Sequence, residues 1–335
     1  MKILHLATEI AGQVSTTARA QRGLGYEAYS LSSPHPFGYD VDIILSGNRF
    51  LRYFQRHVVG IYWLEKFDIF HYHGRGTLMF KEADVRWLML RGKKFFIEFW
   101  GSDVRLYEFE RQRNKYFVVD NNVGQKRKLQ TLQFWSDVTD SVIVADHSID
   151  HILKLYFKNI FHVGQRIEVD HYKPIFPHPG SKVPKIIHAP SAKKTKGTEF
   201  VIKAIDKLTS LKLKFEYVEV HGVSHHEAAR IYQTADIIVD QLTLGSHGVF
   251  ACEAMALGKP VVCYILPELV SQYPEGFPII NANPDNLAEV LEELILDPER
   301  RYHIGVRSRE YAERVHDSRL VARRLIDIYR AKTAC

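Results

Sequence analysis

The chain has 335 residues, of which 46% are hydrophobic and 25% are charged. These values are typical of a globular protein long enough for two domains, and no run of 18 apolar residues occurs, which excludes a membrane-spanning helix. The formal net charge of +6 can attract phosphates or an anionic membrane, but no nucleic-acid-binding motif accompanies it, so we expect no nucleic-acid partner.

Short apolar runs alternate with amphipathic segments along almost the whole chain. The runs predict strands at residues 2–6, 28–31, 69–72, 95–99 and 141–144, and then at 185–188, 215–220, 237–239, 261–265 and 278–280. Helical periodicity predicts helices that include 15–24, 78–90, 199–209, 225–234 and 286–296, followed by 298–315 and 319–331. This alternation predicts an α/β protein with parallel sheets covered by helices on both faces.

A polar, proline-rich segment at residues 170–184 is typical of a linker. It divides the chain into two Rossmann-like halves, which we expect to be an N-terminal domain of residues 1–169 and a C-terminal domain of residues 185–316.

The segment 49–67 is aromatic and basic. Arg49, Arg52 and Arg56 point away from a helical face formed by Phe50, Leu51, Phe54, Val58, Ile61 and Tyr62. Membrane-surface helices show this pattern, and so do core helices with one solvent-exposed side. We expect a core helix here.

The cysteines Cys252, Cys263 and Cys335 show neither metal-binding nor disulfide spacing, which indicates reduced thiols. Residues 1–6 are too short and too interrupted for a signal peptide. We therefore expect a cytoplasmic protein. Peripheral contact with the anionic inner face of the membrane stays open as an alternative.

The segment 248–262 is the most informative part of the chain. Gly248 opens a short helical run, Glu253 lies in its second turn, and Gly258-Lys259-Pro260 ends the helix before a Val-rich strand. A helix N-terminus presents backbone N–H groups and about half a positive charge to an anion. Because a carboxylate one turn further can accept two hydroxyl hydrogen bonds, this pattern predicts a site for a nucleotide sugar.

A second motif runs from His188 to Thr198. It leaves a strand, crosses a loop that contains Lys193, Lys194 and Lys196, and starts a helix near Gly197. Lysines in a loop that follows a strand can neutralise the charge of a diphosphate as point charges. A basic surface loop is the alternative, but the neighbouring Glu253 helix favours a phosphate site.

Two motifs of the first half, residues 70–76 and 99–103, also follow strands, where ligands of open α/β sheets bind. His71 and His73 would share one face of a strand. A metal pair is conceivable there, but we favour histidines that line a cleft. Asp40-Val41-Asp42 matches a metal-binding D-x-D pattern far from the lysine loop, and we attribute the match to chance.

Together these motifs resemble the retaining glycosyltransferases of group 1 (family 4-like), which have the GT-B fold. The resemblance extends nearly from end to end, and its strongest parts are residues 188–198, 235–241 and 248–262. It implies an α/β GT-B architecture of two Rossmann-like domains that face each other across a cleft. It also implies that the last helix, within residues 317–335, returns to the first domain.

The resemblance assigns roles to residues of the second half. Glu253 matches the late glutamate of the family's E-x7-E signature, which binds the ribose diol, and Lys193 and Lys196 match the basic pair that binds the diphosphate. The remaining donor-binding residues would be Ser246, His247, Gly248, Val249 and Phe250, the last three through backbone N–H groups.

The chain departs from the family pattern at three positions. The early glutamate of the signature falls on Gly245, for which Ser246 or His247 would substitute. The usual histidine before Gly-Ser-Asp is Trp100, and Lys193 stands where arginine is usual, which removes bidentate geometry.

These features predict a metal-independent, retaining glycosyltransferase that uses a nucleotide-diphosphate sugar as co-substrate and needs no cofactor. Lys196 and Glu253 would act at the reacting centre. The acceptor, a glycan, a lipid-linked sugar or a small molecule, would enter on the side of Gly12, His73, Trp100, Ser102 and Asp103. The alternatives are a degenerate GT-B protein that binds a nucleotide sugar or a partner without turnover, and a sugar-nucleotide epimerase.

Overall fold

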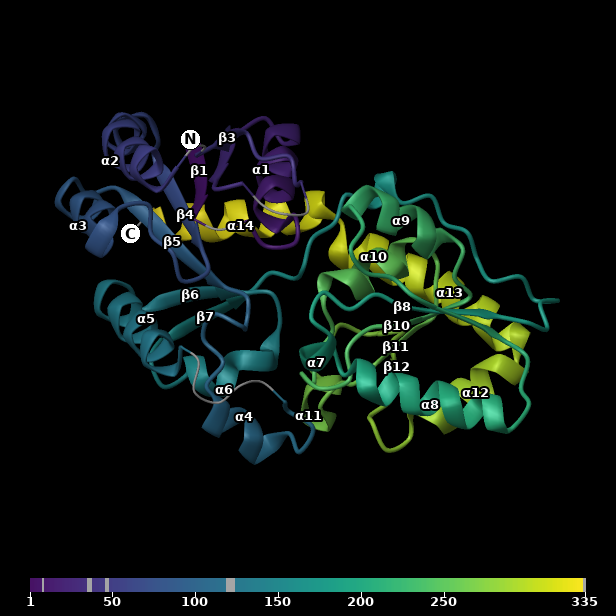
Figure 1. The fold of residues 1–335 in the computed structure, drawn as a ribbon. Coiled ribbons are helices and arrows are strands. Elements are labelled where there is room, and N and C mark those ends of the chain that lie inside the picture. The colour runs from purple at the N-terminus through teal and green to yellow at the C-terminus, as the bar shows by residue number, and fades with distance from the viewer. Residues whose placement is uncertain (8, 35–37, 46–47, 119–123, 334–335) are drawn as a thin grey trace. The chain divides into compact units, whose positions relative to one another are not determined.

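The computed structural model describes residues 1–7, 9–34, 38–45, 48–118 and 124–333, except for the side chains of residues 7, 49 and 59. The chain forms two compact units (Figure 1). Unit 1 comprises Met1–Leu106, Gly124–Arg166 and Ser318–Cys335, and unit 2 comprises Tyr107–Val123 and Ile167–Asp317.

A seven-stranded parallel sheet in the order β3-β2-β1-β4-β5-β6-β7 forms the centre of unit 1. The order reverses between β1 and β4, so ligand chemistry is expected beyond the carboxyl ends of these two strands. The strands are β1 Lys2–Ala7, β2 Glu27–Ser32, β3 Ile43–Ile44, β4 Ile69–His73, β5 Lys94–Phe99, β6 Ser141–Val144 and β7 Asn159–His162. The helices of unit 1 are α1 Gln13–Gly23, α2 Arg49–Lys66, α3 Ala83–Leu90, α5 Gln125–Val138, α6 Asp150–Leu153 and α14 Ser318–Thr333.

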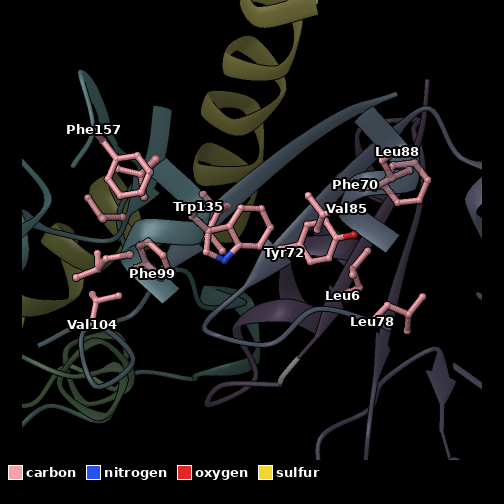
Figure 2. Close-up of a cluster of buried hydrophobic side chains, with 14 of the residues drawn as sticks. Leu6, Phe70, Tyr72, Leu78, Val85, Leu88, Phe99, Val104, Trp135 and Phe157 are labelled. Atoms are coloured by element: carbon pink, nitrogen blue, oxygen red, sulfur yellow. The ribbon is translucent and has the colours of Figure 1, made fainter. Parts of the chain in front are cut away.

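Apolar side chains cover both faces of this sheet, because successive residues of a strand point to opposite faces. On one face, Tyr72 of β4 packs against Trp135 of α5 with ring centroids 5.1 Å apart, between Leu6 and Phe99 (Figure 2). Burying such side chains stabilises the folded state by about 25 cal/mol per Å² of apolar surface removed from water. The core of unit 1 is therefore built from the continuous apolar runs that the sequence shows.

Helix α14 covers the other face of the unit 1 sheet. Val321, Leu325 and Tyr329 are fully buried against Ile3 of β1 and Phe96 of β5. These three side chains recur at helical spacing, as the pattern of residues 319–331 requires. The end of the chain thus completes the domain that the start of the chain begins.

Unit 2 contains a five-stranded parallel sheet in the order β12-β11-β10-β8-β9. Its strands are β8 Lys185–His188, β9 Glu216–Glu219, β10 Ile237–Val239, β11 Val261–Cys263 and β12 Ile280–Asn281. Its helices are α4 Tyr107–Arg113, α7 Lys193–Lys196, α8 Thr198–Ser210, α9 His225–Gln233, α10 Val249–Ala256, α11 Pro267–Val270, α12 Leu287–Leu296 and α13 Pro298–Tyr311. Apolar clusters cover both faces of the sheet, which confirms the predicted parallel sheet covered on both sides.

The structure corrects the predicted domain boundary at one segment. Tyr107–Val123, placed in the first domain by the 1–169 boundary, belongs to unit 2. Its described part is held there by polar contacts: Asn114 donates to the carbonyl of Thr243 at 2.8 Å, and Arg113 donates to Glu268 at 3.0 Å. Such long-range contacts leave no signal in the local sequence pattern.

The proline-rich segment 170–184 also belongs to unit 2. The buried Lys259 donates to the carbonyl of Ile175, and Arg309 donates to the carbonyl of Tyr172 at 2.6 Å. Because these cations satisfy its backbone oxygens, the segment is packed against unit 2, in contrast to the expected linker.

Helix α2 contradicts the expectation of a core-facing apolar side. Phe50 is 85% exposed and Phe54 is 61% exposed, and the rest of the predicted apolar face, Leu51, Val58, Ile61 and Tyr62, is exposed as well. Among the side chains of α2 that the structure describes, the buried positions are instead Gly60 and Leu64. In the part of the chain that the structure describes, no helix is both long and apolar enough to cross a bilayer.

Candidate functional site

The loop after β8 is shaped by Gly197, which lies between α7 and α8. Its φ is +78°, and a Cβ atom there would lie 3.1 Å from side-chain atoms of Leu242 and Thr243. Glycine is therefore the residue that fits both the left-handed backbone and the close approach. The helix start near Gly197 is confirmed, since α8 begins at Thr198.

His188 fastens the end of β8 to the same loop. Its Nδ1 lies 2.9 Å from the carbonyl oxygen of Val239, and its Nε2 lies 2.9 Å from the hydroxyl of Thr198. Burial lowers the pKa of His188, so the ring is neutral. Nδ1 then donates to the carbonyl, and Nε2 accepts from the hydroxyl.

The Lys196 ammonium lies at the N-terminus of α10. A Cβ atom on Gly248 would lie 3.3 Å from the Lys196 Nζ. The ammonium donates to Oε1 of Gln241 and lies 3.5 Å from Oδ1 of the buried Asp240. Oδ2 of Asp240 accepts the backbone N–H of Gly248 at 2.9 Å. The sequence analysis missed these positioning roles of Asp240 and Gln241, although both directly follow a predicted strand.

The N-terminus of α10 combines two sources of positive charge. Gly248 is the N-cap and has no side chain of its own to cap the helix, so the first turn presents backbone N–H groups next to the Lys196 ammonium. Asp240 offsets part of this charge and holds the lysine in place. The arrangement suits an anion with more than one negative charge.

Lys193 is held elsewhere. Its Nζ lies 2.6 Å from Oε1 of Glu219 at the end of β9, and its side chain is 58% exposed against 18% for Lys196. The two predicted basic residues are therefore in different surroundings, and Lys196 alone is positioned by the residues around Gly248.

Glu253 is buried in the second turn of α10 and already accepts two hydrogen bonds. Oε1 lies 3.0 Å from the hydroxyl of Tyr172 and 2.7 Å from Nε2 of His225. The hydrogen bond to the carboxylate raises the pKa of His225. Tyr172 and His225 were missed by the sequence analysis, because they come from the proline-rich segment and from the start of α9.

The remaining predicted donor-side residues differ in accessibility. His247 is buried among aromatic rings, with centroids 5.2 Å from Tyr273 and 5.5 Å from His316. Its ring thus packs into the core of unit 2, which does not fit a role in sugar binding. Ser246 is buried too, and its carbonyl accepts from the Gln241 amide. Val249 and Phe250 are half-buried, so their backbone groups at the helix start fit the expected role better.

Position 245 cannot carry the early glutamate of the signature. Gly245 has a φ of +76°, and a Cβ atom there would lie 2.5 Å from Cγ of Leu266. The departure from the family pattern at this position therefore has a packing reason: Leu266 occupies the space that a side chain would need.

In unit 1, the predicted acceptor-side residue His73 belongs to a buried polar network at the carboxyl ends of β1, β4 and β5. Arg166 donates to both oxygens of Glu98 at 2.7 Å, and nitrogens of His71 and His73 each lie 3.3 Å from Glu98 Oε2. Nδ1 of His5 lies 3.0 Å from Nε2 of His73. Each of these side chains is at most 1% exposed, so the expected cleft-lining position of His73 is wrong.

Burial lowers the pKa of all three histidines, that of His5 to about 3. They are therefore neutral rings, and the guanidinium of Arg166 balances the charge of Glu98. The Trp100 ring lies over this guanidinium, 4.7 Å from its Cζ atom. The network connects the carboxyl ends of β1, β4 and β5, and it leaves His73 without contact with solvent.

The other predicted acceptor-side residues lie in the turn after β5 and at the start of α1. Asp103 is buried and accepts the backbone N–H of Trp100 at 3.1 Å, and burial raises its pKa to about 6. Ser102 is exposed beside it. Gly12 is buried at the start of α1, where Glu9 accepts the backbone N–H groups of Val14 at 3.2 Å and Ser15 at 3.0 Å. A carboxylate of the protein thus neutralises this helix N-terminus.

Among the described residues, two clusters have ligand atoms close enough for a metal ion. The first is His5, His71 and His73, where the adjacent Arg166 cation opposes a second positive charge. The second is His147, Asp150 and His162. Its two imidazoles are stacked with centroids 3.6 Å apart, and the carboxylate binds them at 2.8 and 2.9 Å. Two imidazole rings that bind the same metal ion approach it from different directions. The stacking of His147 on His162 therefore favours a hydrogen-bonded cluster over a metal site.

Asp42, the second acidic residue of the D-x-D pattern, accepts a hydrogen bond from Arg22 at 3.0 Å.

Comparisons with known proteins agree with this architecture. Residues 211–311 match the sequence model of the family "Glycosyl transferases group 1". Sucrose-phosphate synthase from Thermosynechococcus elongatus has a similar structure, with a TM-score of 0.70 at 14% identity over 100% of both chains. Anabaena HepE in complex with UDP has a TM-score of 0.63 at 11% identity over 99% of this chain and 100% of that chain. No curated protein sequence matches the chain. The predicted GT-B fold and the resemblance to group-1 glycosyltransferases are confirmed.

Proposed function

We propose that this GT-B protein, similar over residues 211–311 to the group-1 glycosyltransferases, transfers a sugar from a nucleotide-diphosphate sugar to an acceptor. The transfer retains the anomeric configuration and needs no metal ion. The observation that carries the proposal is the position of the Lys196 ammonium at Gly248, with Glu253 in the second turn of the same helix. Anion and diol recognition are thereby combined in one short stretch of structure.

The chemical task is to stabilise a diphosphate as it leaves the sugar. Lys196 and the N-terminal N–H groups of α10 supply fixed positive charge where negative charge develops, which is the most effective electrostatic arrangement. The acceptor hydroxyl attacks the anomeric carbon from the leaving-group face. As the bond to the phosphate oxygen breaks, this oxygen takes the proton of the hydroxyl, so no protein nucleophile is required.

In this proposal Glu253 accepts hydrogen bonds from the ribose diol. Tyr172 and His225 donate to the same carboxylate, so the diol joins or replaces these donors. Uridine nucleotides are the first donors to test, because HepE, whose fold is similar, has been solved with UDP and with UDP-glucose.

The acceptor is a glycan, a lipid-linked sugar or a small molecule, bound on the side of unit 1. Of the residues predicted there, Ser102 and the half-buried Trp100 are accessible, whereas His73 is not. We further propose a cytoplasmic enzyme in peripheral contact with an anionic membrane.

The test is a transfer and hydrolysis assay of the full chain with a panel of radiolabelled nucleotide sugars. We expect one donor to be consumed, and nuclear magnetic resonance of the product to show the anomeric configuration of the donor. An inverted product would refute the retaining mechanism. A chain that neither binds nor consumes any nucleotide sugar would refute the proposal as a whole.

A second candidate function, binding without turnover, is favoured by the packing at Gly245, where Leu266 excludes the acidic side chain that the family uses. The same assay separates the two functions, since a binding protein shows calorimetric affinity for a nucleotide sugar but releases no sugar from it.

A further inference from the structure

The exposed apolar face of α2, which we name the α2 face, consists of Phe50, Leu51, Phe54, Val58, Ile61 and Tyr62. At 3.6 residues per turn these side chains lie within an arc of about 120°. All six are exposed, and Phe50 is the most exposed of them at 85%. Contiguous apolar surface of this kind is rare on soluble proteins unless it binds something.

The segment that packs beside α2 also exposes apolar side chains. A Cβ atom on Gly60 would lie 2.8 Å from Met79, and Arg91 lies 3.6 Å from Glu65, so the stretch around α3 packs beside the C-terminal part of α2 (Figure 1). This stretch exposes Phe80 and Leu90. Exposed apolar side chains are thus present both on α2 and on the stretch next to it.

Basic residues lie at the edge of the α2 face and on the segment beside it. Glu65 is the only acidic residue of α2, and it pairs with Arg91. The Lys66 ammonium lies 4.1 Å from the centre of the Tyr62 ring at the edge of the face. Of the further basic residues, Arg52 and Arg56 lie on the side of α2 that points away from the face, and Lys81, Arg86, Lys93 and Lys94 belong to α3 and its flanking segments. Aromatic side chains bordered by lysine and arginine match the interface of a bilayer with anionic headgroups.

We propose that the α2 face docks unit 1 on an anionic phospholipid bilayer. A second copy of the chain fits less well, because a two-fold interface would place the same cationic border against itself. Docking requires no sugar transfer. It rests on the proposed function only for its consequence, which is that a lipid-linked acceptor becomes accessible to the enzyme.

The test is flotation of the full chain with phosphatidylcholine vesicles, with or without about 30% phosphatidylglycerol, in the absence of nucleotide sugar. We expect binding to the anionic vesicles to be at least about tenfold stronger and to weaken with salt. The double variant Phe50→Gln/Phe54→Gln should lose at least about tenfold of this binding, since two exposed rings no longer insert. Arg52→Glu/Lys66→Glu should lose as much through charge reversal.

Matched control variants place the same changes elsewhere on the surface. Leu155→Gln/Leu296→Gln removes two exposed apolar side chains, and Lys126→Glu/Arg127→Glu reverses two exposed charges of α5. Both controls should bind vesicles like the parent chain. All variants should keep the parent melting temperature, because each change lies on the surface.

Equal binding to neutral and anionic vesicles, or equal losses in the α2 and control variants, would overturn the proposal. A concentration-dependent dimer that the Phe50→Gln/Phe54→Gln variant abolishes would identify a second copy as the occupant and would also overturn it. Vesicle binding without sugar transfer would leave docking intact and refute the proposed function. Sugar transfer to a soluble acceptor without vesicle binding would support the proposed function and refute docking.

Discussion

Replacing Lys196 by alanine should impair sugar transfer far more than replacing Lys193. The two lysines lie three residues apart in one loop, but only Lys196 is positioned at the start of α10. Its side chain is 18% exposed, and its ammonium is fixed by Gln241 and Asp240. Lys193 is mostly exposed and paired with Glu219.

The expected magnitudes follow from these surroundings. A charged hydrogen bond in a partly buried site contributes about 1.5–3 kcal/mol, which corresponds to about a 10- to 150-fold loss in kcat/KM for Lys196→Ala. An exposed ion pair contributes about 0–1 kcal/mol, which limits the loss for Lys193→Ala to about fivefold. If Lys196 acts on the leaving diphosphate in the transition state, its loss lowers kcat as well as kcat/KM.

The assay is steady-state transfer with the donor that the panel of nucleotide sugars identifies. One control is needed, because Lys196→Ala leaves the buried Asp240 without its nearby cation, and Oδ1 of Asp240 makes no hydrogen bond to any described residue. Lys196→Ala/Asp240→Asn removes that charge and should regain thermal stability, but it should not regain activity. Equal, small effects of Lys196→Ala and Lys193→Ala would show that the loop is a basic surface without a catalytic role.

Three further predictions concern residues of unit 2, and a fourth concerns metal dependence. Glu253→Ala should abolish calorimetric donor binding with the fold intact, and unchanged affinity would remove Glu253 from the site. Since the hydrogen bond to Glu253 raises the pKa of His225, a diol that displaces His225 releases its proton. Donor affinity should therefore rise with pH across about pH 6–8 in the parent chain and stay flat in His225→Ala. Gly245→Ala should lower the free energy of unfolding by about 2–5 kcal/mol, from left-handed backbone strain of about 1–2 kcal/mol and overpacking of about 1–3 kcal/mol. Denaturant titration should show part of this loss recovered in Gly245→Ala/Leu266→Ala. Excess EDTA should leave transfer unchanged, and recovery of a chelated enzyme by added manganese would contradict the metal-independent mechanism.

The sequence predicts most of the fold because buried parallel strands are continuous apolar runs. Strands β4, β5 and β8 lie within a residue of their expected bounds. Two strands were not predicted, each for a physical reason. β3 has only two residues, and β7, Asn159–His162, is a half-buried edge strand with polar ends. Neither has the apolar run that marks a central strand.

The candidate site was predictable where local rules determine it. Lys196 and Gly248 follow neighbouring parallel strands, and the carboxyl ends of such strands meet at one edge of the sheet, so their proximity could be inferred. Asp240, His225 and Tyr172 could not be assigned in the same way, because their roles depend on contacts between distant segments. The α2 pattern fits a core helix and a membrane helix equally well, and only burial in the structure separates them.

The two units use the carboxyl edges of their sheets in opposite ways. In unit 1, the protein pairs its own charges: Glu98 is bound by Arg166, and Glu9 accepts the N–H groups of Val14 and Ser15 at the start of α1. In unit 2, Asp240 accepts the N–H of Gly248, but this N-cap glycine has no side chain to cap the first turn of α10, and Lys196 lies beside it. A charged ligand gains little where the charges are already paired, and gains most where fixed positive charge is only partly offset. In the proposed reaction, the binding energy for a nucleotide diphosphate should therefore come from unit 2, and unit 1 should select the acceptor.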